Sequence, residues 1–323
     1  MLFLFRTNQV LYSILLILYT IVLRISYFIT PYTTPATNDG FLSVFFKECL
    51  NSHYLLANTA IVFLISLQAI LINNLTAKYR LFDEVTLFPG LFYIMLVSSI
   101  SDFLPLSSIL LGNTFLILAI SALFATYKTP KCADAIFNIG FWIGTASLFY
   151  NAFVFFLLLA WFGLFSLRSF KAKESLIMLI GYLLPFGFAL TYFFWIDQIS
   201  IFWNTYFLAQ FNLLDFNLDG GANYYKLLIL GLFFLMGLFN GYSFNKSFKT
   251  RNYMNIIYLT LLISGITFLF QDNIRITHFL IIMIPLSILV AARFLSMSKT
   301  TAEFVHLFLF IGIILFQFKV FNL

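Results

Sequence analysis

Charged side chains are scarce in this chain. Asp, Glu, Lys and Arg make up 9% of the 323 residues, whereas 62% are hydrophobic and the mean hydropathy is +0.99. Apolar runs are long enough to cross a hydrocarbon core of about 30 Å, which takes roughly 20 residues per helix. The length then leaves almost no room for a soluble domain. We expect an all-α polytopic transmembrane helix bundle, a single transmembrane domain over residues 1–323.

Motifs that bind nucleotides or activate a serine are also missing. The sequence has no Walker loop, no Gly-x-Gly-x-x-Gly, no Gly-x-Ser-x-Gly and no Cys-x-x-Cys. ATP-driven transport and nucleotide-dependent oxidation are therefore poorly supported.

Residues that ligate metals are few. The two cysteines, Cys49 and Cys132, are expected on opposite sides of the membrane and unpaired. His53 and His306 have no partners at ligand spacing, so no metal site is predicted from them. The cofactor stays unassigned, and a divalent cation held by the two aspartates of residues 215–219 remains an open alternative.

Hydropathy and the polar residues between apolar runs predict eleven spans. No small-x-small cleavage site follows the first apolar run, so that span is expected to stay uncleaved. The spans that meet at Tyr150 and Asn151 are expected either to turn tightly at the outer surface or to form a re-entrant hairpin. The predicted spans are Val10–Ile29, Tyr54–Asn73, Val85–Ser101, Leu106–Ala125, Ala135–Phe149, Ala152–Leu167, Leu176–Trp195, Leu227–Phe244, Met254–Phe270, Thr277–Ala292 and Val305–Phe318.

Lysine and arginine set the expected orientation. With the amino terminus inside, thirteen of the 18 fall on the cytoplasmic side, in agreement with the positive-inside rule. The four expected outside are Lys47, Lys226, Arg275 and Lys319, and Arg24 lies within a span. The predicted location is the inner membrane of a bacterium, with membrane lipids as partners. Because topology accounts for the net charge of +6, no nucleic-acid partner is expected.

Two outer loops are longer than a turn requires. Thr30–His53 presents Asp39 and then Phe41–Leu50, where polar residues interrupt apolar ones as in a short amphipathic helix on the membrane surface. Trp195–Tyr225 combines tryptophans, aspartates and a Gly-Gly break, which is typical of an interfacial helix followed by a loop. Either loop can cap a cavity at the outer surface.

Arg24 is the most informative residue of the first span. A charge at mid-depth in a bilayer costs roughly 2.5 to 3.5 kcal/mol on insertion scales, and less near the edge. Its presence favours an active site at the outer membrane surface. The alternative is that its side chain snorkels outward from near the span end.

Several features follow one another along Val10–Ala292. After the late arginine, the acidic loop and the surface helix come Asp102-Phe-Leu-Pro105 between two spans, Gly140-Phe-Trp-Ile-Gly144-Thr-Ala-Ser after a basic turn, and Arg275-Ile-Thr-His278-Phe leading to Pro285. Their order resembles the GT-C superfamily of polyprenyl-phosphate-dependent glycosyltransferases, which includes protein mannosyltransferases and the lipid A aminoarabinose transferase. The chain is also similar to uncharacterised bacterial integral membrane proteins.

The resemblance implies a membrane glycosyltransferase with a GT-C-like bundle. Such an enzyme moves a sugar from a lipid-linked polyprenyl-phosphate donor to an acceptor at the periplasmic face, with inversion at the sugar carbon. The family commonly has an acidic pair at the catalytic position, whereas Asn38 precedes Asp39 here. The large soluble carboxy-terminal domain of oligosaccharyltransferases is not expected, which counts against recognition of a protein sequon.

The chemistry of glycosyl transfer assigns candidate roles. A carboxylate must activate the acceptor hydroxyl, and cations must stabilise the leaving phosphate. Asp39 and Asp102 are the candidate catalytic residues, with Asp39 as the base. The alternative for Asp39 is an ordinary turn position before Gly40, and for Asp102 a cap of the next helix.

Four cations are candidates to bind the donor phosphate. They are Arg24, Arg275, His278 and Lys226. Arginine suits phosphate because its planar guanidinium makes paired, charge-assisted hydrogen bonds. His278 has the alternative of a packed or interfacial histidine.

Two other function classes stay open. A non-catalytic integral membrane subunit of an envelope assembly or secretion complex would keep the bundle, bind other membrane proteins and have no need of Asp39. A secondary transporter is the third class, although the cytoplasmic half lacks mid-membrane carboxylates and shows no inverted repeat. The donor sugar and the acceptor are not set by the sequence.

Overall fold

The computed structural model describes residues 2–7, 9–29, 40–51, 54–168, 171–207, 224–238, 247–270 and 275–318. Within these ranges the side chains of 10, 11, 49–51, 54, 205–207, 224–228, 238, 269 and 270 are not described. The described ranges contain helices and turns and no β-strand, so the all-helical prediction is confirmed for them.

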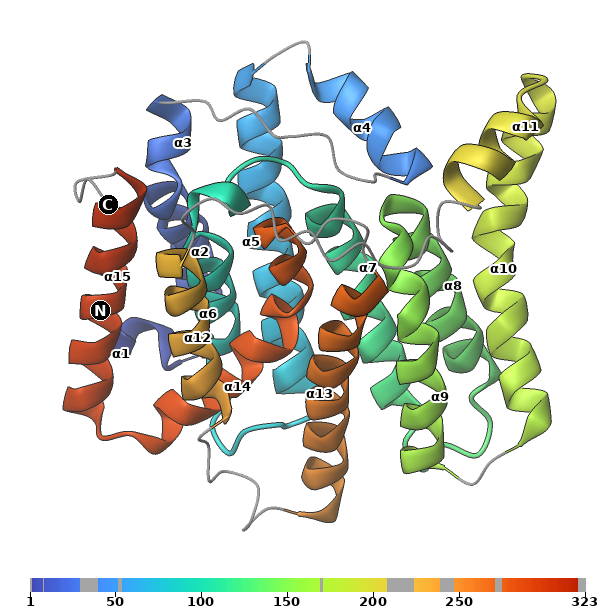
Figure 1. Ribbon diagram of the computed structural model, residues 1–323. Helices are drawn as coiled ribbons and strands as arrows, with labels where there is room; N and C mark the ends of the chain where they lie inside the picture. Colours follow the sequence, from blue (N-terminus) through green and yellow to red (C-terminus); the bar gives the residue numbers. More distant parts are fainter. Residues whose placement is uncertain are drawn as a thin grey trace.

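Helices follow one another along the whole described chain (Figure 1). The first part contains α1 (Leu2–Phe5), α2 (Val10–Leu23), α3 (Ile25–Ile29), α4 (Phe41–Asn51), α5 (Tyr54–Lys78), α6 (Phe88–Val97), η1 (Ser101–Phe103) and α7 (Ser108–Ala125). The middle contains α8 (Ala133–Phe149), η2 (Asn151–Phe155), α9 (Phe156–Leu167), α10 (Ala172–Trp195), α11 (Ile199–Ile201) and η3 (Phe202–Phe207). The last part contains α12 (Tyr224–Leu238), α13 (Phe248–Ile266), η6 (Thr267–Phe270), η7 (Ile276–Ile281), α14 (Met283–Ser296) and α15 (Lys299–Gln317).

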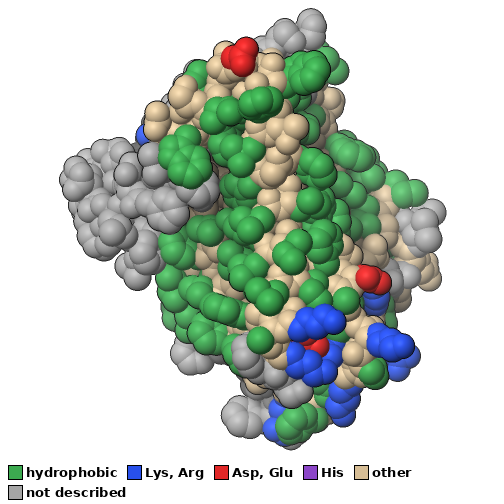
Figure 2. All heavy atoms as spheres, turned by 90° about the vertical axis from the view of Figure 1, so that its right-hand side faces the viewer, with side chains coloured by type: hydrophobic (Ala, Val, Ile, Leu, Met, Phe, Trp, Pro, Cys, Tyr) green, Lys and Arg blue, Asp and Glu red, His purple; other side chains and the backbone are tan. Residues whose placement is uncertain are grey.

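Four of these helices are long and apolar enough to cross a membrane. They are Leu55–Lys78, Ser108–Ala125, Ala172–Trp195 and Lys299–Gln317, and the described residues also form shorter apolar helices. Large hydrophobic side chains cover the outside, as Figure 2 shows for one face, and Phe63, Phe188 and Phe308 are each more than 60% exposed. Such a surface is unfavourable in water. The helices therefore suggest a membrane protein, and the number of spans stays a prediction.

The bundle has two distinct ends. The α4 end carries α3, α4 and the last turn of α10, near the top of Figure 1, and includes η1 and η7 on the same side of the bundle. The basic end carries the turns between α5 and α6, α7 and α8, α9 and α10, and α14 and α15. Figure 2 shows lysine and arginine gathered at one end of a largely hydrophobic face.

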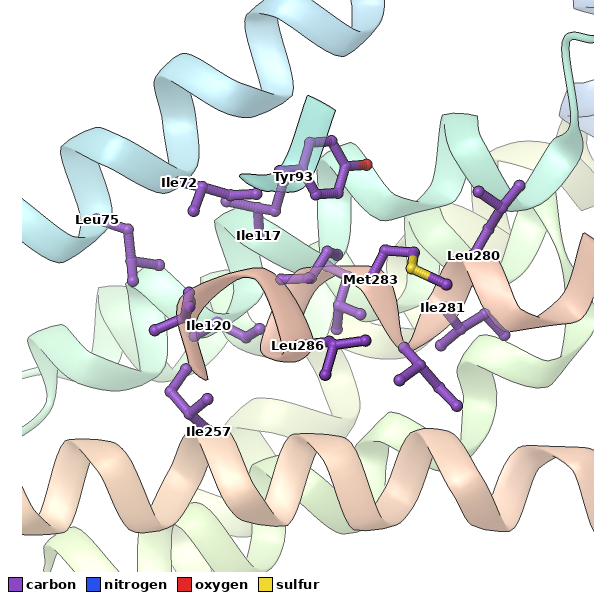
Figure 3. Close-up of a cluster of buried hydrophobic side chains, with 14 of the residues drawn as sticks. Ile72, Leu75, Tyr93, Ile117, Ile120, Ile257, Leu280, Ile281, Met283 and Leu286 are labelled. Atoms are coloured by element: carbon purple, nitrogen blue, oxygen red, sulfur yellow. The ribbon is translucent and has the colours of Figure 1, made fainter. Parts of the chain in front are cut away.

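The core lies between α5, α6, α7, α13 and α14. Figure 3 shows Ile72, Ile117, Ile257 and Leu286 converging from four of these helices, and all four are at most 2% exposed. Close-packed branched side chains hold helices at fixed separation in lipid, where no hydrophobic effect drives them together. This packing fixes α5, α7, α13 and α14 against one another.

Glycines bring α8 and α10 into backbone contact. A Cβ added to Gly140 of α8 would lie 1.9 Å from the Met178 carbonyl oxygen, and one added to Gly181 of α10 would lie 2.3 Å from that of Phe137. Gly144, one turn after Gly140, lies equally close to α10. Small residues four apart allow such an approach in membrane helices. These glycines therefore serve helix packing.

The joint between α8 and α9 lies beneath the start of α4. Gly40 donates its backbone N–H to the Phe149 carbonyl at 2.9 Å, and the Tyr150 side chain is 1% exposed. The helix predicted at Phe41–Leu50 is present as α4, and Phe41 packs against Phe193 of α10 with ring centroids 4.7 Å apart. The predicted joint is thus covered by protein.

The amino-terminal segment is docked on the bundle. The Leu2 backbone N–H donates to both carboxylate oxygens of Glu303 in α15 at 3.1 Å. Leu87 donates its backbone N–H to the Phe5 carbonyl at 2.9 Å, and Leu2 and Phe5 are buried. The first residues therefore join α15 to the turn before α6.

Candidate functional site

The path between α6 and α7 bends sharply at the α4 end. After α6 ends at Val97, the chain turns, forms η1 and resumes as α7 at Ser108. Pro105 has no backbone N–H and cannot continue a helical hydrogen-bond ladder from η1. The result is a short stretch of irregular backbone, the elbow (residues 98–107), whose carbonyl groups need partners.

Arg24 supplies partners to this elbow. It ends α2, and its guanidinium Nη2 donates to the Phe103 carbonyl at 2.9 Å and also to that of Leu104. Its side chain is 1% exposed, so the snorkelling alternative is wrong. The other terminal nitrogen, Nη1, is buried and has no hydrogen-bond partner in the described part of the chain.

No carboxylate neutralises Arg24 among the described residues. Its electrostatic environment contains the hydroxyls of Tyr27 and Tyr93, and the ion pairs seen elsewhere involve Arg6 and Arg168. A buried charge without a counter-ion is costly in a medium of low dielectric constant. Arg24 is therefore a cation able to attract an anion from outside the chain.

A chain of polar contacts continues from the break at Arg24. Ser26 of α3 donates to Gln317 Oε1 at 2.8 Å, and the Gln317 amide donates to the Ser98 carbonyl at 2.5 Å. Neither Ser98 nor Gln317 was identified from the sequence. Gln317 is a lone polar residue in an apolar run and Ser98 directly precedes Ser99, and neither lies in a pattern that indicates its partner.

The segment around η7 lies against the elbow. η7 contacts both η1 and α7, and Asn113 of α7 donates its side-chain amide to the Leu280 carbonyl at 2.9 Å. Tyr93 of α6 has both Asn113 and Arg24 in its electrostatic environment. Tyr93 and Asn113 are further polar residues that sequence reasoning missed, because both lie inside apolar stretches.

His278 is held by its own segment. Its Nδ1 accepts a hydrogen bond from the Arg275 backbone N–H at 3.1 Å, and its ring packs on Tyr150 with centroids 5.8 Å apart. A ring nitrogen that accepts from an amide carries no proton, so the neutral ring has its proton on Nε2. Nε2 is thus a donor, while the partly exposed Arg275 begins η7.

Asp102 lies in η1 with a partly exposed side chain. Its Oδ1 accepts from the Ser101 hydroxyl at 3.3 Å. The residue that caps α7 is Ser107, whose hydroxyl accepts from the Leu110 backbone N–H at 3.1 Å. The alternative that Asp102 caps α7 is therefore wrong. Ser107 directly precedes the helix, where a serine side chain can reach the free N–H groups.

Unpartnered polar atoms gather at this same end. Ten buried side-chain nitrogen and oxygen atoms lack a hydrogen-bond partner in the described part of the chain, and seven belong to the α4 end or the adjoining helix turns. Such atoms ordinarily take a partner from water, an ion or a ligand. The residues that carry the seven atoms are Arg24, Asn58, Ser98, Ser108, Asn113 and Thr277.

Other predicted residues fall outside this description. Asp39, His53 and the aspartates of 215–219 lie outside the described residues, as does the side chain of Lys226 in α12. The described residues contain no group of three or more His, Cys, Asp or Glu able to hold a metal ion. His306 is a packed histidine, whose Nε2 lies 3.1 Å from the Tyr19 hydroxyl.

Neither known protein families nor curated proteins provide a match to this chain.

Proposed function

We propose that the chain is a membrane glycosyltransferase that takes its sugar from a polyprenyl-phosphate donor at the α4 end. The observation that carries the proposal is Arg24, a fully buried guanidinium with one unpartnered nitrogen and no described carboxylate beside it. A phosphate is the anion that arginine binds best through paired hydrogen bonds. The proposal places the head group between Arg24, the elbow and η7.

Three cationic or donor groups support this placement. Arg24 contacts η1, η1 contacts η7, and η7 follows Arg275 and carries the Nε2 donor of His278. Lys226 is proposed as a fourth ligand. Asp39 is proposed as the base that activates the acceptor hydroxyl, with Asp102 of η1 as the second carboxylate.

Binding of a bare lipid phosphate tests the proposal most directly. The protein is reconstituted in nanodiscs and titrated with undecaprenyl phosphate. Arg275→Gln is expected to weaken binding by about 10-fold to 150-fold, because a hydrogen bond to a charged group contributes about 1.5 to 3 kcal/mol. Arg293→Gln, the same change at the opposite end of α14, is the control and is expected to leave binding unchanged. Equal binding by both variants contradicts the proposal.

Turnover tests the catalytic assignment separately. Asp39→Asn is expected to fold normally and to reduce sugar transfer by on the order of 100-fold or more, as loss of a general base does. Binding of undecaprenyl phosphate by Asp39→Asn should stay within about twofold, because the base does not hold the phosphate.

A second candidate is a non-catalytic subunit of an envelope complex. The observation in its favour is that Arg24 and His278 are both bonded to main-chain groups, as packing residues are. Full cellular function of Asp39→Asn, together with no binding of undecaprenyl phosphate, would make this the better account.

A further inference from the structure

An aromatic cluster joins three helices at the basic end. The Tyr253 ring of α13 stacks on Phe124 of α7 with centroids 4.5 Å apart, and its edge meets Tyr79 and Tyr127 at 5.4 and 5.6 Å. The Tyr253 hydroxyl donates to the Phe124 carbonyl at 3.2 Å, and the Tyr79 hydroxyl donates to the Ser121 carbonyl at 2.8 Å. The ends of α5 and α7 and the start of α13 are thereby held together.

Three lysines surround this cluster, one from each of its three chain segments. Each ammonium lies over the face or edge of a tyrosine ring, where a cation is attracted by the ring quadrupole. The Nζ atoms of Lys78, Lys128 and Lys249 lie 5.3, 5.5 and 5.8 Å from the ring centroids of Tyr79, Tyr127 and Tyr253. All three lysines are exposed.

These lysines differ from two arginines of the same end. Arg6 pairs with Glu84 at 2.9 Å, and Arg168 pairs with Glu174 at 3.1 Å. None of Lys78, Lys128 and Lys249 has a carboxylate partner in the described part of the chain. Three like charges around one rigid cluster repel one another, and an anion placed among them relieves that repulsion.

We propose that Lys78, Lys128 and Lys249, the lysine triad, bind the phosphate of an anionic phospholipid from the surrounding bilayer. Basic pockets between membrane helices bind acidic lipid head groups, and tyrosine is suited to the interface because its ring is apolar and its hydroxyl polar. Phe248, next to Lys249, is 75% exposed and offers apolar surface to an acyl chain. This apolar neighbour favours a lipid over an acidic protein segment. The proposal is independent of glycosyl transfer.

Native mass spectrometry of the full chain tests the lysine triad. The protein is released from nanodiscs that contain equal amounts of phosphatidylglycerol and phosphatidylcholine, and the lipids that stay bound are counted. The wild-type protein is expected to retain phosphatidylglycerol about tenfold more than phosphatidylcholine, and the variant with all three lysines changed to Gln is expected to lose that preference. Lys131→Gln, Lys171→Gln and Lys173→Gln together remove the same charge from exposed positions of the same end and form the control.

The control variant distinguishes a specific lipid-binding site at the lysine triad from non-specific attraction of anionic lipid by the positive charge of this end. Retention within about twofold of the wild-type preference by the control supports the lysine triad, whereas an equal loss in both variants overturns it. A wild-type protein without a preference for phosphatidylglycerol also overturns it. Added inorganic phosphate should displace little of the bound lipid, because it lacks the acyl chains, and full displacement would identify a site for free phosphate instead. Helical circular dichroism of each variant establishes that it is folded.

Discussion

Arg24 donates a hydrogen bond to the Phe103 carbonyl at 2.9 Å, across 79 residues of sequence. This bond joins the break between α2 and α3 to the elbow between α6 and α7. A helix break and a sharp bend of the chain thus meet at one buried cation. Irregular backbone at membrane depth is tolerated only where its polar groups find partners inside the protein, and the guanidinium provides them.

Removal of this guanidinium should destabilise the bundle. Arg24→Ala leaves the carbonyls of Phe103 and Leu104 buried without their donor, and a cost of roughly 2 to 4 kcal/mol is expected for two such groups. The midpoint of unfolding by sodium dodecyl sulfate should fall accordingly. Arg293→Ala, in the last turn of α14 at the basic end, serves as a comparison and is expected to change the midpoint little. An unchanged midpoint for Arg24→Ala would mean that these bonds do not stabilise the elbow.

Two glycines of α10 provide a matched test of helix packing. Gly181→Ala places a Cβ 2.3 Å from the Phe137 carbonyl oxygen, so α8 and α10 must separate, at a cost of about 1 to 3 kcal/mol. A Cβ at Gly187 meets nothing within 4 Å, so Gly187→Ala should be neutral or stabilise by up to about 1 kcal/mol. Thermal unfolding in detergent measures both. Equal effects of the two substitutions would argue against close packing of α8 and α10.

Cys132 should react slowly with alkylating reagents. Burial raises the pKa of its thiol above the ordinary value, although the neighbouring Arg168, which donates to its Sγ, favours the thiolate. A raised pKa leaves less thiolate at neutral pH, so the rate should keep increasing up to and beyond pH 9, about tenfold per pH unit below the pKa. Iodoacetamide labelling of Cys49→Ser measures this rate.

The comparison for Cys132 is a cysteine at the exposed Thr129 in the same turn, with both native cysteines changed to serine. We expect Cys132 to react about tenfold more slowly than this cysteine at pH 7. A faster reaction of Cys132 would show that Arg168 outweighs burial.

Orientation in the membrane can be read from two exposed positions. In a Cys49→Ser background, Gln198→Cys at the α4 end should react with an impermeant thiol reagent in intact cells. Lys171→Cys at the basic end should react only after the membrane is permeabilised. The reverse labelling pattern would mean that the bundle has the opposite orientation in the membrane, with the elbow on the cytoplasmic side.

The sequence predicted the helices much better than their contacts. Hydropathy located apolar segments such as Leu176–Trp195, because a membrane helix needs little beyond length and apolar character, and the observed α10 is Ala172–Trp195. The interruption at Arg24 was visible as a charge, but its partners are carbonyl groups, which every residue has. No side-chain pattern can indicate which carbonyl a distant arginine will meet.

The candidate site was predictable only in part. Arg24, Asp102 and His278 were identified by their charge and position. Arg24 contacts η1, Asp102 lies in η1, and His278 lies in η7, which contacts η1. Asn113 and Ser98 were missed because an amide or hydroxyl next to an apolar run does not indicate which distant group it will meet. The alternative that Asp102 caps α7 was wrong, since the sequence does not show that η1 intervenes and that Ser107 directly precedes the helix.

The bond between Leu2 and Glu303 links the first described residue to the last helix of the bundle. During synthesis the amino-terminal segment must therefore wait until α15 has left the ribosome before it can dock. Docking of this segment is therefore a late step of assembly, although Leu2 is synthesised long before Glu303.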